Sequence, residues 1–399
     1  MINQLLFTPP RKTSVNSDPE TCKISVDIII YCVKITTLIK QRSVMFKILA
    51  INPGSTSTKI AVYFDEKEVF KKTITHSETE LSNFKHIIDQ YDFRRKAIEE
   101  VLEEHNYNVH DFDAFVGRGG LVKPIPSGTY KVSDQLIDDL KHSKMGEHAS
   151  NLGGMVALAF EKESGKPSFI VDPVVVDELS DLARLTGFPE IERVSIFHAL
   201  NQKAVARRAA KELEKKYEDL NLIVVHLGGG ISVGAHKNGM VVDVNNALNG
   251  DGPYAPERAG SVPAWGLYKF IKEHNMDEKD FKKRLAGKAG IVAHLGTNDM
   301  RKVEDEVKAG NKKYELIYKG MAYNIGKWVG AMAAVLEGKV DAIVITGGLA
   351  YDKGFIGWLK DMVGFIGKVI VYPGEDEMSA LALGGLRVLT GEEKVREYK

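Results

Sequence analysis

Short apolar runs alternate along the chain with amphipathic stretches, and this alternation predicts strands and helices in turn. In the first half, "KILAIN", "TKIAVYF" and "VFKKTI" are expected to form a three-stranded meander. A helix is predicted over Phe93–His105, and "FDAFVGRGG" should be a strand that ends in glycines. A second helix should end at Gly165, and the strand "PSFIVDPVV" should end at Asp172.

The second half repeats this order of elements. In "NLIVVHLGGGISVGAHKNGMVVDV" we expect strand, glycine loop, strand, Asn238-Gly239 turn and strand, because Asn-Gly between apolar runs is a strong hairpin signal. A long helix is predicted over Tyr314–Gly338, followed by strand, helix, strand and a last helix. Both halves open with a hairpin whose first connection is rich in glycine or serine. The pattern therefore predicts an α/β protein with two similarly built domains.

Residues 1–44 differ from the rest of the chain. Their run "VDIIIYCVKITTLI" is apolar and β-branched, but Asp27 and Lys34 interrupt it. A signal or anchor segment is one interpretation, yet the apolar core is short and no small-residue cleavage site follows. We expect residues 1–44 to be an extension outside the core fold, 45–185 an N-terminal domain and 186–399 a C-terminal domain.

Composition narrows the function classes. The 54 Lys and Arg balance the 54 Asp and Glu, so the chain lacks the basic surface typical of proteins that bind nucleic acid or anionic membranes. No apolar run reaches transmembrane length. The two cysteines, Cys22 and Cys32, both precede the first predicted strand, which argues against a disulfide framework or a cysteine metal site in the core. We expect a cytoplasmic enzyme or binding protein.

The first hairpin connection carries candidate chemistry. "INPGSTSTK" contains Asn52, Ser55, Ser57 and Lys59, which are typical of a loop that binds phosphate. No helix follows, as a P-loop would require, but successive backbone N–H groups in a turn can also form an anion site. The alternative is a plain tight hairpin.

The second connection, "HLGGGIS", begins at His226. Its glycines let a backbone approach a ligand closely, because no Cβ atom intervenes. These glycines are Gly228, Gly229 and Gly230. A dinucleotide loop would need a helix directly afterwards, and the alternative to a ligand loop is a bulged barrel corner. In "TGGLA", Gly347 and Gly348 lie between a strand and a helix, where an adenosine or phosphate could bind.

Charged and titratable residues lie close to several of these motifs. Arg118 ends an apolar strand, and Arg258 lies in a Gly/Pro-rich loop. A guanidinium group suits phosphate or carboxylate oxygens. The alternative for each arginine is a structural salt bridge. His198 and His148 each come at the start of a helix, where a structural role is common. The remaining candidates are two carboxylates, Asp172 and Glu377.

Together these ordered motifs resemble the acetate and butyrate kinases, a family within the acetate kinase, sugar kinase, heat-shock 70 and actin superfamily. The resemblance runs from Met45 to about Thr390. It implies two ribonuclease-H-like domains of related topology, the actin-like ATPase fold, with the active site in the cleft between them. It also implies that the last helix packs back on the first domain.

The resemblance assigns roles to individual residues. The residues implied to bind ATP or ADP are Asn52, Ser55, Ser57, Lys59, His226, Gly228, Gly229, Gly230, Gly347 and Gly348. Those implied to position magnesium are Asn52, Asp172 and Glu377. The implied catalytic residues are Arg118, Arg258, His198, His148 and Asp172, and the implied substrate-binding residues are Arg118, Gly120 and Phe197.

Two departures point to the butyrate branch. Acetate-type members usually have "HLGNGSS" and "NAGSS", whereas this chain has "HLGGGIS", with Gly229 in place of asparagine, and "NPGST". Gly120 replaces a valine and should leave room for a propyl tail. The expected reaction is ATP + butyrate ⇌ butyryl phosphate + ADP with magnesium.

Two alternatives stay open. The substrate could be acetate, propionate or isobutyrate, or the chain could be a non-catalytic ATP-binding switch. We expect a short-chain carboxylic acid as partner and a homodimer or higher homo-oligomer, with no nucleic acid and no membrane.

Overall fold

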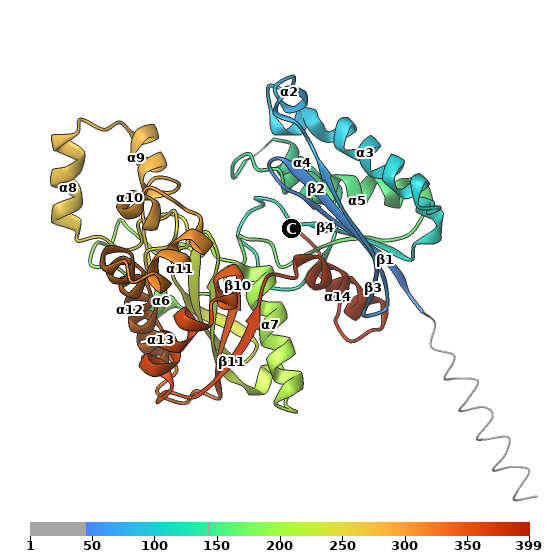
Figure 1. Cartoon of the computed structure of the whole chain (residues 1–399). Coiled ribbons are helices and arrows are strands. Elements are labelled where there is room, and N and C mark those ends of the chain that lie inside the picture. The colour runs from blue at the N-terminus through green and yellow to red at the C-terminus, as the bar shows by residue number, and fades with distance from the viewer. Residues whose placement is uncertain (1–44, 143) are drawn as a thin grey trace, which may run out of the picture. The chain divides into compact units, whose positions relative to one another are not determined.

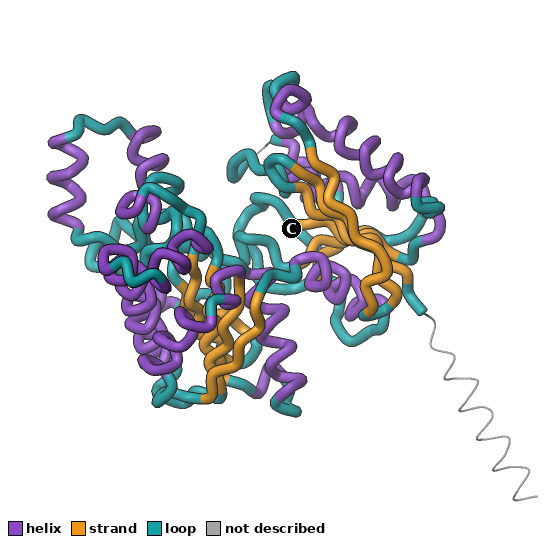
Figure 2. The backbone as a smooth tube through the Cα atoms, viewed as in Figure 1, coloured by secondary structure: helices purple, strands orange, loops and turns teal. Residues whose placement is uncertain are grey.

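The computed structural model describes residues 45–142 and 144–399, so the expected extension 1–44 lies outside the described part (Figure 1). Its strands form two mixed sheets, seen as two groups of orange strands in Figure 2. The three strands at the start of each sheet run antiparallel, as the meander pattern predicts. The fold is therefore α/β, in agreement with the sequence prediction.

The first sheet has the order β3-β2-β1-β4-β6-β5. β4 and β6 join β1 in parallel, and β5 closes the sheet antiparallel to β6. Its strands are β1 (Lys47–Pro53), β2 (Ser57–Phe64), β3 (Lys67–Thr75), β4 (Ala114–Arg118), β5 (Thr129–Lys131) and β6 (Ser168–Val171).

The second sheet has the order β11-β10-β7-β8-β9. β10 pairs in parallel with both β7 and β11, so the sequence of pairings from β9 to β11 repeats that from β3 to β6. The strands are β7 (Asn221–Leu227), β8 (Ile231–Lys237), β9 (Met240–Val244), β10 (Ala342–Gly347) and β11 (Lys368–Pro373). The expected likeness of the two halves is thus confirmed at the level of topology.

The helices that the sequence pattern predicts are present within a few residues, and the structure adds several shorter helices that it did not predict. The α-helices are α2 (Glu78–Leu81), α3 (Tyr91–Glu104), α4 (Asp134–Lys141), α5 (Asn151–Ser164), α6 (Asp181–Arg184), α7 (Ala199–Glu212), α8 (Ala264–Glu273), α9 (Glu278–Leu285), α10 (Ile291–Leu295), α11 (Met300–Lys308), α12 (Lys312–Val335), α13 (Lys353–Val363) and α14 (Glu377–Leu389). Single 3₁₀ turns are η1 (Ile87–Gln90), η2 (Val109–Asp111), η3 (Tyr217–Asp219) and η4 (Gly348–Tyr351). Gly165 ends α5 with φ 73°, a left-handed conformation that favours glycine.

Strand β1 is apolar without a break because helices cover both faces of its sheet. Ile48 and Ala50 pack against Leu381 of α14, whereas Leu49 and Ile51 face the opposite side and pack with α3 and α5. Helix α14 follows the last strand of the second sheet yet packs on the first (Figure 1). This return brings the start of α14 close to the ends of β1 and β4.

The second sheet is covered in the same way. Leu222 and Val224 of β7 pack against α7, and the alternate residues Ile223 and Val225 pack against α12 and α13.

The turn between β8 and β9 is the predicted Asn-Gly hairpin, since Asn238 and Gly239 have φ of 52° and 76°.

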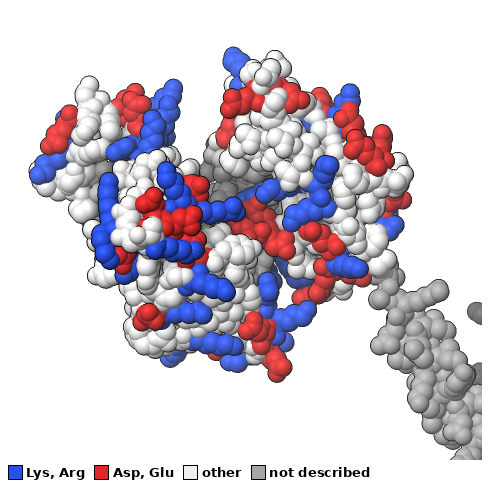
Figure 3. All heavy atoms as spheres, in the orientation of Figure 1, with Lys and Arg blue, Asp and Glu red and all other residues white. Residues whose placement is uncertain are grey.

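The surface carries both signs of charge. On the face that Figure 3 shows, Lys and Arg are interspersed with Asp and Glu, which agrees with the balanced composition. Among the described helices, none has the length and apolar character needed to cross a bilayer.

Candidate active site

Asn52 lies at the end of β1, and two later elements converge on it. Its Nδ2 donates to Glu377 Oε2 at 2.8 Å, and its Oδ1 accepts from Arg118 Nη1 at 3.4 Å. Glu377 begins α14, and Arg118 is the last residue of β4. Lys59 pairs directly with Asn52 across β1 and β2, so both side chains lie on the same face of the sheet. The structure thus brings four of the predicted residues together.

The hairpin connection between β1 and β2 is held from inside by Arg94. This fully buried residue of α3 donates from Nη2 to the Ser55 carbonyl and from Nη1 to the Ser57 carbonyl, both at 3.0 Å. The carbonyl of Thr56 accepts from the His76 backbone N–H at 2.9 Å. Three successive carbonyls of the loop therefore accept hydrogen bonds from within the protein, while Ser55 and Thr56 are exposed.

Arg94 has no ion-pair partner among the described carboxylates, and its remaining hydrogen bonds go to the Gln90 amide oxygen and to Thr58 Oγ1. Burial lowers the pKa of Arg94 to about 10, which still leaves the guanidinium charged at neutral pH. A buried positive charge directly behind this loop adds to the attraction for an anion on its outer side. Sequence reasoning missed this residue, because Arg94 looks like part of an ordinary charged helix face.

The loop between β7 and β8 encloses two of the predicted residues. A Cβ atom at Gly230 would lie 1.8 Å from Arg258 Nη1, and one at Gly228 would lie 2.8 Å from His226 Nε2. A side chain at either position would therefore displace Arg258 or His226 from its place in the loop. Gly229 is exposed, and its nearest neighbour would be Glu257 at 3.8 Å, so only this glycine leaves open space for a ligand.

His226 connects this loop to the segment that precedes α14. Its Nε2 lies 3.1 Å from Glu375 Oε1, and its Nδ1 lies 2.8 Å from Asn201 Oδ1. The hydrogen bond with His226 lowers the pKa of Glu375, and the charges of Arg118 and Lys59 act in the same direction. Sequence reasoning missed Glu375, although the acidic run "GEDE" after the last strand is a signal that could have found it.

His198 precedes α7 and stacks on His226, with ring centroids 3.8 Å apart and an interplanar angle of 13°. Its Nδ1 lies 2.9 Å from Ser232 Oγ. Burial, followed by the positive charges around it, including Arg258 and Arg118, holds the pKa of His198 well below its usual value. The two arginines and this histidine therefore share one electrostatic environment.

His148 lies shortly before α5. Its Nδ1 is 2.7 Å from Ser150 Oγ. Partial desolvation and then the charge of Arg118 lower the pKa of His148.

Asp172 is held in a separate network. It follows β6 with φ 38°, and its Oδ1 accepts from Ser127 Oγ at 2.6 Å and from the Gly128 N–H at 2.8 Å. Its Oδ2 lies 3.4 Å from Arg207 Nη1. Burial would raise the pKa of Asp172, but Arg207 and Lys203 outweigh it and hold the pKa below its usual range. A catalytic or magnesium role for Asp172 stays a prediction, because these partners explain its burial by themselves.

Gly347 and Gly348 were expected to lie at the N-terminus of a helix, but the structure places them before a 3₁₀ turn. Gly347 has φ 97°, and a Cβ there would lie 2.3 Å from the Leu227 carbonyl oxygen, whereas Gly348 faces open space. The pair leads into η4, and α13 starts only at Lys353, where Asp352 accepts from the N–H groups of Gly354 and Phe355. The helix N-terminus is therefore already capped, and nucleotide binding by the pair stays a prediction.

Two of the predicted substrate-binding residues, Gly120 and Phe197, are closely packed. A Cβ at Gly120 would lie 2.5 Å from the Asn151 Cα and 2.3 Å from Asn151 Oδ1, so the missing side chain is replaced by α5 and not by empty space. The reason given from sequence for Gly120 is therefore wrong. Phe197 is buried in a cluster with Val241 and Val244. Contact of either residue with substrate stays a prediction.

The chemistry of the donors fits magnesium that arrives with a nucleotide. No group of three or more His, Cys, Asp or Glu in residues 45–142 and 144–399 is arranged to hold a metal. Mg²⁺ commonly uses one or two carboxylates together with substrate phosphates and water. The carboxylate of Glu377 and the amide oxygen of Asn52 are suitable oxygen ligands beside the first loop.

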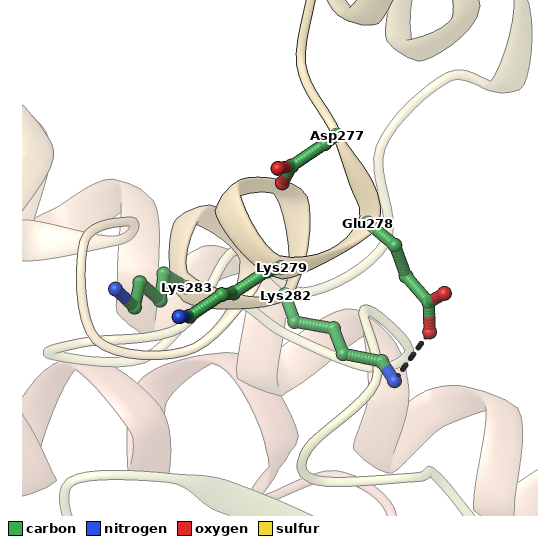
Figure 4. Close-up of a pocket in the computed structure, with 5 residues that line it drawn as sticks. All are labelled: Asp277, Glu278, Lys279, Lys282 and Lys283. Atoms are coloured by element: carbon green, nitrogen blue, oxygen red, sulfur yellow. Dashed lines mark ion pairs between the residues drawn. The ribbon is translucent and has the colours of Figure 1, made fainter.

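A surface pocket lies on α9, outside this cluster. Its lining residues come from one short stretch of the chain and point outward, and Lys282 pairs with Glu278 at 2.6 Å (Figure 4). They are Asp277, Glu278, Lys279, Lys282 and Lys283. Because none of the predicted site residues lines it, this pocket is a charged surface depression and not the candidate active site.

Comparison with known proteins identifies the family. Residues 191–357 match the model of the acetokinase family. The chain is 52% identical over 354 residues to butyrate kinase 2 of Clostridium acetobutylicum, covering 89% of this chain and 99% of that protein. It is 54% identical over 353 residues to a probable butyrate kinase of Clostridium botulinum strain Alaska E43, covering 88% and 99% of the two chains.

Solved structures show the same fold. The acetate kinase of Porphyromonas gingivalis superposes with a TM-score of 0.72 at 22% identity, covering 86% of this chain and all of that one. A propionate kinase from Francisella tularensis gives 0.66 at 18% identity, covering 85% and 99%. The two related sheets are those of the actin-like ATPase fold, and with more than half of its residues identical to butyrate kinases over nearly their full length, the chain belongs to the acetokinase family of carboxylate kinases.

Proposed function

We propose that this chain transfers the γ-phosphoryl group of ATP to butyrate, giving butyryl phosphate and ADP. The observation that carries the proposal is the position of Arg118 beside Asn52 at the first anion-suited loop and of Arg258 against Gly230 in the second, where the charges of both arginines also act on His198. A module that only binds a nucleotide needs no cationic cluster beyond the phosphates. The cluster favours a kinase over the alternative of a non-catalytic ATP-binding switch.

The proposed roles follow from charge. A carboxylate acceptor is ionised at neutral pH, so no general base is required. Two arginines would hold the carboxylate and the phosphoryl group together against their repulsion. His198 would donate a hydrogen bond to the transferring phosphoryl group, whose charge is spread over its oxygens in the transition state.

Binding of the nucleotide is assigned to both loops. The hydroxyl groups of Ser55 and Ser57 and the side chain of Lys59 would contact the phosphates from the first loop, and the exposed backbone at Gly229 from the second. Glu377 and Asn52 would hold Mg²⁺, which neutralises phosphate charge when bound. Their contacts with Arg118 would have to loosen when the metal enters.

The choice of butyrate rests on the relatives. The two relatives named butyrate kinase and probable butyrate kinase are 52% and 54% identical, whereas the acetate and propionate kinases of known structure are 22% and 18% identical. Acetate, propionate and isobutyrate are the competing substrates within the family.

A hydroxamate assay for acyl phosphate tests the proposal directly. The chain is incubated with Mg·ATP and acetate, propionate, butyrate or isobutyrate in parallel. We expect kcat/KM for butyrate to exceed that for acetate by roughly ten-fold, since each buried methylene contributes about 0.8 kcal/mol. Higher kcat/KM with another acid would reassign the substrate, and acyl phosphate from none of the four would exclude the carboxylate kinase activity.

Two further properties are proposed on the same basis. We place the reaction in the cytoplasm, where ATP and short acids are available.

Self-association is supported by a run of exposed apolar side chains, Leu182, Leu185, Phe188 and Ile191, with exposed fractions of 83, 69, 66 and 58%. Light scattering of the chain and of a Phe188→Asp variant would test this, and a monomer in both would exclude it.

A further inference from the structure

A continuous chain of buried hydrogen bonds leads from Tyr217 to His198. Tyr217 Oη lies 2.7 Å from His236 Nδ1, and His236 Nε2 lies 2.9 Å from Gln202 Oε1. Gln202 Nε2 donates to Ser232 Oγ at 2.8 Å, and Ser232 Oγ lies 2.9 Å from His198 Nδ1. Tyr217, Gln202, Ser232 and His236 are all buried.

The secondary structure places the members of this hydrogen-bond chain beside one another. His198 and Gln202 are four residues apart at the start of α7 and so lie on one face of the helix. Ser232, Gly234 and His236 alternate along β8, which places them on one face of the sheet. A Cβ at Gly234 would lie 2.6 Å from Gln202 Oε1, so glycine is needed where the glutamine crosses the strand.

The orientation of the Gln202 amide is determined independently of the histidines. Its Nε2 also lies 3.1 Å from the backbone carbonyl oxygen of Ser232, which can only accept a hydrogen bond. The nitrogen must therefore face Ser232, and the oxygen must face His236. A carbonyl oxygen only accepts, so His236 carries its proton on Nε2 and accepts from Tyr217 on Nδ1.

The same logic continues to His198. Ser232 Oγ accepts from the amide of Gln202, so its own hydrogen is free to be donated to His198 Nδ1. An Nδ1 that accepts leaves the proton of the neutral ring on Nε2. The ring is partly exposed, unlike the rest of the chain of hydrogen bonds.

We infer that Gln202, acting through Ser232, is a positioning residue that holds His198 as the neutral Nε2–H tautomer, so that His198 presents a hydrogen-bond donor to the transferring phosphoryl group. The role of that donor rests on the proposed function, whereas the tautomer does not. The groups whose charge acts on His198 are His226 of β7, which stacks on its ring, Arg258 from the loop after β9 and Arg118 of β4. All three disfavour a second proton on the ring, so the donor has to come from the tautomer.

The tautomer can be measured on the unaltered chain. Long-range proton–nitrogen NMR correlations of protein labelled with ¹⁵N-histidine distinguish Nε2–H, Nδ1–H and doubly protonated rings, and a His198→Asn variant assigns the signal. We expect Nε2–H at pH 7.5. An Nδ1–H or doubly protonated His198 would overturn the inference even if butyrate is phosphorylated, and Nε2–H without kinase activity would leave the inference standing while the proposed function fails.

A Gln202→Glu variant tests the link to turnover. A carboxylate cannot donate to Ser232 Oγ, so the serine hydrogen turns toward the introduced carboxylate and His198 is driven to the Nδ1–H form. We expect kcat for butyrate to fall at least ten-fold at pH 8 and to recover as the pH is lowered toward 6, where a proton on the introduced carboxyl group lets it donate to Ser232 Oγ and so restores the Nε2–H form of His198. Gln135→Glu on the exposed face of α4 makes the same chemical change and should leave kcat and its pH profile unaltered. A Gln202→Glu profile parallel to that of the unaltered chain would exclude the positioning role.

Discussion

The guanidinium of Arg118 and the carboxylate of Glu377 are in direct contact, although 259 residues separate them in the chain. Asn52 bonds to both and completes a three-residue cluster at the ends of β1 and β4 and the start of α14. The contact exists because α14 returns to pack on the first sheet. Under the proposed mechanism, Arg118 would leave Glu377 to bind the substrate carboxylate, and Glu377 would then be free to hold the magnesium ion.

Two replacements of Arg118 should show how much of its effect on kcat comes from the positive charge and how much from the planar shape of the guanidinium group. Arg118→Ala is expected to lower kcat for butyrate by about two orders of magnitude or more, as is typical when a transition-state charge stabiliser is removed. Arg118→Lys keeps the charge but loses the planar fork, so most of the loss should remain. Steady-state kinetics of both variants measure the effect, and near-normal kcat in Arg118→Ala would remove this residue from the proposed mechanism.

Replacing Arg94 should affect ATP more than the acid. Arg94→Lys retains a buried charge but cannot hold the carbonyls of Ser55 and Ser57 together. The first loop should then lose its shape, and we expect KM for ATP to rise roughly ten-fold with KM for butyrate little changed, which corresponds to about 1.4 kcal/mol. Arg95→Lys on the same helix is the matched control, since Arg95 pairs with Glu99 and Glu163 on the surface. Equal changes in both KM values would contradict a role confined to the nucleotide loop.

Filling the space at Gly120 should damage the fold locally and not shift specificity. A side chain there meets the backbone of Asn151, which cannot move without displacing α5. We expect Gly120→Val to lower the melting temperature and both butyrate and acetate turnover together, because overpacking costs about 1–3 kcal/mol. Gly357→Ala in α13 meets nothing within 4 Å and serves as the control. A selective loss of butyrate turnover with unchanged stability would instead restore Gly120 as a wall of the acyl pocket.

Stability should fall as the pH drops below the ordinary histidine range. Burial, as the largest cause, lowers the pKa of His76, His148, His198 and His236 in the folded chain. A group with a depressed folded pKa binds its proton preferentially when unfolded, so its stabilisation is complete above about pH 6.5 and is lost below it. Urea unfolding at pH 7.5 and 5.5 should show the decrease. His236→Gln should show a smaller decrease, and an equal one would contradict the contribution of His236.

Local sequence was enough to establish the class of the fold and to identify several residues of the candidate site. The apolar runs, glycines and Asn-Gly turn act through local backbone preferences, so the strands, the repeated hairpins and the long helices were predictable from their own residues. The motif around Asn52 and the "HLGGGIS" loop were recognisable for the same reason, because each lies within a short continuous stretch. The resemblance to a kinase family rested on these stretches.

Which distant residues meet became clear only from the folded chain. Arg94, Glu375 and Gln202 had not been assigned to the site, because an arginine or glutamine in a helix is ordinary until its partners are known. Gly120 shows the opposite case: its lack of a side chain suggested an open pocket, but α5 occupies that space. Packing of elements far apart in the chain depends on the summed burial of many side chains, and so the contacts that orient His198 and hold the first loop follow from the whole fold and not from any one segment.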